Sequence, residues 1–248
     1  MRFPLLAVLS LLSFTAQAIT NVEEKRAGDD LLGWSGKAEV GFDAESGNNE
    51  KRKWNLGLNG NWQDDNKRFF TWGNRSYESS NGERTDDDTF IHSRLVLNRR
   101  DTWSEEFYAQ YERDPFAALA HRALIGAGMR YQHAFDEQTR LHQGIGLFHE
   151  EVRERVLDED NSSQLTRLSL YTHIQWKLAY SKLQSTLYFQ PSVDEPSDQR
   201  ALWQLAVTLP LGTHTDLKWQ WQSRWDTRPP EGTEYHNHQT QLKLVVRF

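Results

Sequence analysis

The sequence predicts an all-β fold, a transmembrane antiparallel β-barrel of about twelve strands. From Leu32 onward, apolar and polar residues alternate in segments close to the roughly 9 to 11 residues that a tilted membrane strand needs. The connections between these segments alternate between short and long. The final segment, 241–248, also alternates and ends on Phe248. These three observations indicate strands with one face for lipid and one for water.

The composition alone suggests a different class of protein. A mean hydropathy of -0.79 with 26% charged residues is typical of a soluble domain. Ten Trp, eight Tyr and twelve Phe are a heavy aromatic load for so polar a chain, and the aromatic girdles of a membrane barrel would use them. A barrel reconciles the two, because only alternate residues face lipid. The net charge of -6 argues against nucleic acid as a partner.

The start of the chain has the pattern of a secretory signal peptide. Arg2 gives a positive start, an apolar core follows, and Ala16-Gln17-Ala18 supplies the small-x-small pattern for cleavage. The apolar core is shorter than the roughly 20 residues of a transmembrane helix. We therefore expect a signal peptide over 1–18, a short periplasmic segment over 19–31 and the barrel over 32–248. With no cysteine, the chain has neither a lipidated Cys anchor nor disulfides.

Alternation fixes which side chains face lipid. Near residue 170, we expect Leu168, Leu170, Ile174 and Trp176 to face lipid, and Arg167, His173, Gln175 and Lys177 to face water. The same parity places toward lipid Leu217, Trp219 and Trp221; Leu183, Leu187 and Phe189; Trp203, Leu205, Val207 and Leu209; Trp54, Leu56, Leu58 and Trp62; and Trp34, Ala38, Val40 and Phe42. A slip by one residue would move charges into hydrocarbon at about 2–4 kcal/mol each near the midplane. Residues 69–77 are less regular, because polar residues flank Arg75 on both sides.

The connections predict the orientation of the barrel. Short turns fall at 63–67, 98–101, 135–138, 179–181 and 211–214, and longer polar stretches at 43–52, 78–88, 114–121, 152–164, 191–199 and 226–236. In outer-membrane barrels the short turns are periplasmic and the long loops extracellular. Both termini should therefore face the periplasm, and the strand number should be even. A soluble β-sandwich or a lipocalin-like barrel fits less well, because both bury their apolar faces internally.

Several short motifs resemble one known family. They are Gly33-Trp34-Ser35-Gly36, Ser46-Gly47-Asn48, the stretch from Gln110 to Phe116, and Arg122 followed by Gly126-Ala127-Gly128. The chain resembles the salt-induced, YdiY-like outer-membrane proteins, a group defined by domain of unknown function 481. The resemblance covers most of the mature chain. It implies an outer-membrane barrel and no established activity, so it supplies no catalytic residue.

The inward faces are rich in charge, and basic residues predominate. The residues expected to face the lumen are Lys37, Glu39, Arg94, Glu106, Glu112, Arg122, Arg130, Arg167, Lys177, Asp216, Lys218, Arg224, Lys243 and Arg247. One interpretation is a narrow passive pore for small anionic or zwitterionic solutes. The alternative is a closed structural barrel, in which Glu106 and Glu112 pair with Arg94 and with Arg122 or Arg130.

Two glycine pairs lie on the consecutive strands expected around residues 127 and 145. Parity points Gly126, Gly128, Gly144 and Gly146 inward, and no helix follows, so a phosphate-binding loop is excluded. Because glycine weakens a strand, the close approach of another group is the better explanation. We expect an inward aromatic such as Tyr108 or Tyr171 to lie against them, or free lumen to remain.

The sequence predicts no enzyme, cofactor or metal site. An outer-membrane lipid hydrolase is a less favoured alternative, because His149 is the only rim histidine and only Thr166 stands near it on the next strand. His236 and His238 share a strand face without a third ligand. The acidic runs 86–88 and 158–160 are predicted to be solvated loop tips.

The expected surroundings follow from the location. A terminal Phe248 resembles the signal by which the barrel-assembly machinery recognises its clients. The predicted location is the outer membrane of a Gram-negative bacterium, after cleavage near Ala18. The expected partners are outer-membrane lipid and lipopolysaccharide, with the assembly machinery and periplasmic chaperones acting during biogenesis.

Overall fold

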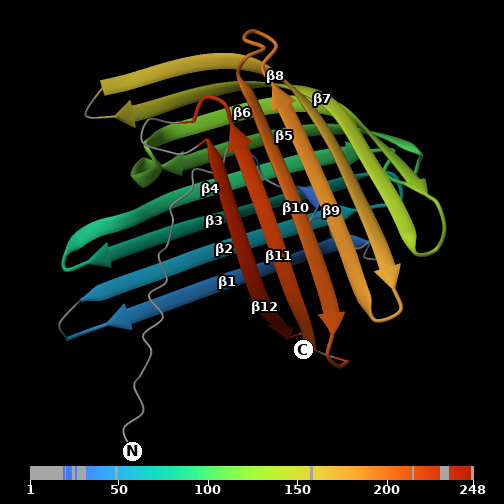
Figure 1. Cartoon of the computed structure of the whole chain (residues 1–248), viewed down its shortest axis with the longest axis horizontal. Coiled ribbons are helices and arrows are strands. Elements are labelled where there is room, and N and C mark those ends of the chain that lie inside the picture. Colours follow the sequence, from blue (N-terminus) through green and yellow to red (C-terminus); the bar gives the residue numbers. More distant parts are fainter. Residues whose placement is uncertain are drawn as a thin grey trace, which may run out of the picture.

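The structure is a computed structural model that describes residues 19, 21–23, 26, 32–47, 50–156, 159–213, 215–229 and 235–246. Twelve strands form one sheet in sequence order, each antiparallel to the next, and the sheet curls into a barrel (Figure 1). The strands are β1 (Gly33–Glu45), β2 (Lys51–Gln63), β3 (Arg68–Ser80), β4 (Glu83–Leu97), β5 (Trp103–Asp114), β6 (Leu119–Ala134), β7 (Thr139–Val156), β8 (Glu159–Leu178), β9 (Ser181–Pro191), β10 (Gln199–Pro210), β11 (Thr215–Asp226) and β12 (His236–Val246).

The predicted fold class is confirmed. A 3₁₀ turn, η2 (Pro115–Ala117), follows β5, and no helix of the described residues is long and apolar enough to cross a membrane. Backbone pairing between β1 and β12 is not among the pairings of the described residues, and the predicted assembly signal, Phe248, lies outside them together with Arg247.

The facing of the strands follows the alternation. On β9 and β10, Leu187 and Trp203 point outward and are 49% and 46% exposed, whereas Tyr188 and Leu202 point inward and are buried. Strand β3, the irregular one, turns Phe70 and Trp72 inward. Its Arg75 points outward, where the guanidinium lies over the ring of Trp54 at 5.9 Å. An aromatic neighbour on β2 therefore accommodates this charge on the outer face.

Several predicted loops are instead continuations of strands. In place of a loop over 78–88, β3 and β4 meet at a tight turn in which Asn81 and Gly82 have φ of 51° and 84°. The run Asp86-Asp87-Asp88 consequently lies within β4, and Asp87 is buried against Arg75, Arg84 and Arg113, not solvated at a tip. Above the membrane both faces of a strand are wet, so pairing continues without alternation in hydropathy. The sequence pattern therefore ends before the strand does.

The buried core lies inside the barrel. One cluster joins Val22 to the inward residues Phe70, Trp72, Phe90 and Val96. A second cluster joins Ile19 to Tyr188 and Leu202. Residues that precede the first strand thus take part in the packing of the lumen.

Candidate functional site in the lumen

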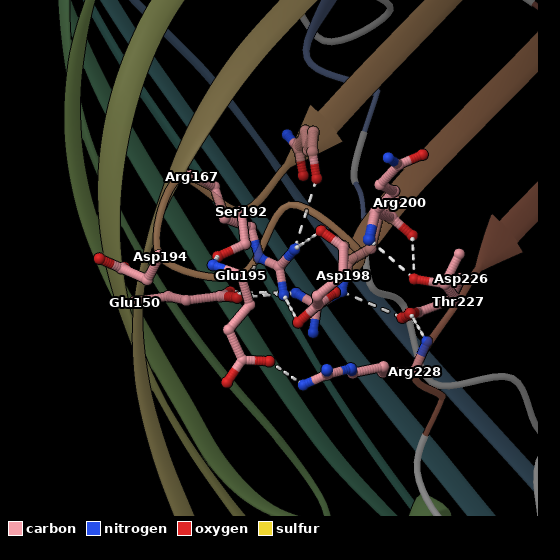
Figure 2. A network of polar contacts seen from close by, with 12 residues as sticks. Glu150, Arg167, Ser192, Asp194, Glu195, Asp198, Arg200, Asp226, Thr227 and Arg228 are labelled. Atoms are coloured by element: carbon pink, nitrogen blue, oxygen red, sulfur yellow. Dashed lines mark hydrogen bonds and ion pairs between the residues drawn. The ribbon is translucent and has the colours of Figure 1, made fainter.

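The long-loop half of the lumen contains a network of buried charges centred on Glu150 of β7 (Figure 2). Its carboxylate accepts hydrogen bonds from three guanidiniums on three other strands. Arg122 Nε on β6 lies at 2.8 Å, Arg167 Nε on β8 at 2.5 Å and Arg200 Nη1 on β10 at 2.9 Å. Glu150 and Arg167 are completely buried. The network therefore ties β10 to β7, although these two strands are not neighbours in the sheet.

The same network reaches the long connections. Arg167 also binds Asp198 at 2.7 Å, and Arg200 binds Asp226 at 3.0 Å. Figure 2 shows Arg228 turned toward Glu195, with which it forms an exposed ion pair. These contacts join the β9–β10 connection to the start of the β11–β12 connection over the lumen wall.

A segment before β1 lies across the middle of the lumen. We call its described residues, Ile19, Asn21, Val22, Glu23 and Arg26, the luminal segment. Asn21 Nδ2 donates to Thr186 Oγ1 at 3.3 Å, and the backbone N–H of Val22 donates to the hydroxyl of Tyr188 at 3.3 Å. Both partners belong to β9.

The charged end of the luminal segment reaches other walls. Glu23 binds Arg130 of β6 at 3.1 Å and Arg26 at 2.8 Å. Arg26 also binds Glu106 of β5, and its guanidinium lies over the ring of Phe70 on β3 at 5.4 Å. Since β3 and β9 are half the sheet apart, the luminal segment spans the lumen. The sequence led us to expect these residues in the periplasm. The segment makes its contacts one side chain at a time in the barrel wall. Its sequence therefore has no hydrophobic periodicity from which this position could be predicted.

The predicted lumen residues fall into three groups. Buried ones are Arg94, Glu106, Glu112, Arg122, Arg130, Arg167 and Asp216. Arg224 and Lys218 are half-buried, while Lys37, Glu39, Lys177 and Lys243 are exposed and Arg247 lies outside the described residues. Lys37 and Glu39 form an exposed ion pair with each other.

The expected ion pairs are present in altered form. Arg94 binds Glu106 as expected. Arg122 stands 3.8 Å from Glu112 but makes its hydrogen bonds with Glu150, and Arg130 pairs with Glu23. Sequence reasoning missed Glu150 and Arg200, although their parity with Phe148 and Leu202 pointed inward. It also missed Glu23 and Arg26, for which the sequence offered no signal.

Two cavities flank the luminal segment. The cavity on the short-turn side has a volume of about 500 Å³, and its lining includes Arg68, Arg99, Arg130, Arg140, Lys182 and Lys218, with Glu23 as the one carboxylate of that lining. On the other side, toward the Glu150 network, a cavity of about 40 Å³ remains between Val22, His92 and Arg122. The cavity on the short-turn side is therefore the larger and the more basic of the two.

The inward glycines make room for tyrosines. A Cβ on Gly126 would lie 2.6 Å from Cζ of Tyr108, and one on Gly144 would lie 2.6 Å from Cζ of Tyr171. The expected approach of these two rings is confirmed. Gly128 and Gly146 face each other across β6 and β7, where a Cβ would meet the backbone of the opposite strand.

His149, His236 and His238 have ordinary partners. His149 Nδ1 lies 3.4 Å from Thr166 Oγ1 on the outer face, and His236 and His238 stack on Trp225 and Trp221. Within the described ranges, no group of three or more His, Asp or Glu side chains could hold a metal ion.

Comparison with known proteins supports the architecture. The family described as "Protein of unknown function, DUF481" matches residues 38–248. A NanC porin structure is similar with a TM-score of 0.50 at 6% identity, covering 79% of this chain and 94% of that one. The translocator domain of the autotransporter NalP from Neisseria meningitidis has a TM-score of 0.48 at 12% identity, covering 87% of each chain. No curated protein matched the chain in sequence. At such identities the likeness concerns the fold alone.

Proposed function

The chain belongs to the DUF481 family, and from this premise we propose that it is an outer-membrane pore for small anionic or zwitterionic solutes whose resting state is closed by its own luminal segment. One observation carries the proposal. The residues that fill the middle of the lumen belong to a segment outside the sheet, and a wide basic cavity lies beside them. A barrel filled by its own strands would not leave such an arrangement.

The luminal segment is attached in a way that allows release. Its described contacts with the barrel wall are made by side chains and by the backbone N–H of Val22, not by strand pairing. Buried ion pairs gain little beyond the cost of taking their charges out of water. The segment can therefore leave its pockets without any strand of the sheet separating from its neighbour.

The cavity beside the segment accounts for the class of solute. Seven basic side chains, Arg26 among them, with a single carboxylate would concentrate small anions at this mouth. Zwitterions would also enter, because the ion pairs deeper in the lumen offer both signs of charge.

The location and partners form part of the proposal. The outward apolar faces suit lipid, and the long hairpins suit contact with lipopolysaccharide outside the cell. Residues 1–18 would be removed on export, and the barrel-assembly machinery would insert the mature chain. The protein would act without a cofactor and without catalysis.

The second candidate is a closed structural barrel, and the Glu150 network favours it. A completely buried carboxylate held by three guanidiniums would fill part of the lumen on its side. The two candidates differ in what release of the luminal segment does. Release opens a pore in the first and has no effect on conductance in the second.

Single-channel recording in planar bilayers tests the proposal. We expect the wild type to be closed most of the time, and Glu23→Gln or Arg26→Ala to raise the open fraction about tenfold, since a hydrogen bond to a charged group contributes about 1.5–3 kcal/mol. Glu137→Gln, at an exposed turn residue outside both ionic clusters, is the control. Folded segment variants that stay silent would reject the pore in favour of the closed barrel.

A further inference from the structure

The wall of the lumen presents two opposite charges side by side to the luminal segment. Glu106 of β5 and Arg130 of β6 are on paired strands, where Glu106 lies opposite Gly128 and Arg130 opposite Ser104. Both side chains are buried. They are therefore held at a fixed short separation on the inner face.

The luminal segment answers each wall charge with its opposite. Arg26 binds Oε1 of Glu106, and Glu23 binds Arg130 through Nη2 at 3.1 Å. Arg26 Nε also donates to Glu23 at 2.8 Å, so the two segment residues present one joined pair of charges. Glu106 and Arg130 of the wall therefore bind a guanidinium and a carboxylate that both belong to the luminal segment.

The half of this site that binds a cation, at Glu106, also contains an aromatic ring. The Arg26 guanidinium lies over Phe70 at 5.4 Å, and Phe70 is 1% exposed. A ring face and a carboxylate together select a planar or alkylated cation. The other oxygen of Glu106, Oε2, accepts from Arg94, which orients the carboxylate.

The half of the site that binds an anion, at Arg130, has an unused hydrogen-bond donor among the described residues. Nε of the buried Arg130 has no hydrogen-bond partner among the described residues. A guanidinium binds a carboxylate best through two parallel hydrogen bonds, and Glu23 uses only one. A free carboxylate could therefore bind Arg130 better than the chain's own residue does.

We infer that Glu106, Phe70 and Arg130 form a binding site for a small zwitterion bearing a guanidinium or ammonium group and a carboxylate, and that Glu23 and Arg26 occupy this site in the closed state. A simple anion would leave Glu106 Oε1 without a cationic partner. A simple cation would leave Arg130 without an anionic partner. The inference names a solute class for the proposed pore. It rests on the proposed function in one respect, which is that the solute reaches the site through the lumen.

Binding to the folded full-length mature protein tests the site without any need for conduction. The probe is L-arginine, titrated calorimetrically into detergent-solubilised wild type and Arg26→Ala. Arg26→Ala removes the guanidinium that is bound to Glu106. We expect this variant to bind L-arginine about tenfold more tightly than wild type does. Agmatine, which lacks the carboxylate, should bind it about tenfold more weakly than L-arginine does.

Two further variants identify the wall groups. Adding Glu106→Gln or Arg130→Gln to Arg26→Ala should abolish binding of L-arginine, whereas adding the exposed Glu137→Gln should not. Because Glu106→Gln also removes a partner of Arg94, each variant must first show the heat-modifiable migration of a folded barrel. If Glu106→Gln fails this check, the Arg130→Gln arm decides. The inference would be overturned if folded Arg26→Ala did not bind L-arginine, or if it bound agmatine as tightly as L-arginine. Binding without conductance would instead retain the site and reject the pore.

Discussion

At the scale of single residues, the clearest feature is the concentration of ionic contacts on Glu150. Three guanidiniums share this one carboxylate, and each comes from a different strand. Removal of one member of a buried ionic network costs more than the network adds to stability, because the remaining charges stay buried without compensation. Glu150 is therefore the side chain whose loss the barrel should tolerate least.

This gives a matched pair of substitutions at adjacent positions. We expect Glu150→Ala to lower the free energy of unfolding by about 3–5 kcal/mol. Glu151→Ala should change it by less than about 0.5 kcal/mol, because its side chain points outward and is 48% exposed. Urea titration in lipid vesicles measures both. Equal losses for the two variants would show that the three arginines do not depend on Glu150.

At the scale of the strands, the pleat explains which features were predictable from the sequence. Where one face meets lipid, as on β9 and β10, alternation identified both the strand and its facing. It also placed four glycines on the inner face, where an aromatic such as Tyr108 or Tyr171 was one of two expected explanations, and both rings lie there. The extension of β3 and β4 around Asp87 was not predictable in this way, because a wet strand has no hydropathy pattern. The luminal segment lacks pattern for another reason, since its hydrogen bonds to the wall depend on side chains 80 to 166 residues further along the chain.

The facing of β8 can be tested with two arginines on the same strand. We expect Leu170→Arg to destabilise the barrel by about 2–4 kcal/mol, because this position faces lipid. Gln175→Arg should be tolerated, because Gln175 lines the wide cavity in the lumen. Folding yield and unfolding free energy in vesicles provide the readouts. A penalty on the second variant as large as that on the first would mean that the facing of β8 is wrong.

At the scale of the whole molecule, one sheet provides two separate environments. Its outer face is largely apolar apart from the charges around Asp87, and its inner face holds two ionic clusters, one at the long loops and one at the luminal segment. The charges that make the composition look soluble are largely enclosed. Mean hydropathy fails for such a chain because it averages over the two faces.

Assembly of the whole barrel is expected to depend on the end of the chain. Deleting Phe248, or replacing it with a charged residue, should leave unassembled protein in the periplasm, because the last strand is proposed to carry the recognition signal. Fractionation and heat-modifiability on gels measure this. Substitution of Leu211, an exposed turn residue, is the control. Normal amounts of folded protein in the outer membrane without Phe248 would contradict the prediction.

The position of the luminal segment also dictates an order of events in folding. Asn21 and Val22 bind side chains of β9 that are 165 and 166 residues further along the chain. These partners exist as a surface only after β9 has joined the sheet. Residues that precede β1 therefore reach their final contacts only after a strand far along the chain is in place. Docking of the segment is accordingly a late step, which can occur only in a chain whose wall is already built from β3 to β9.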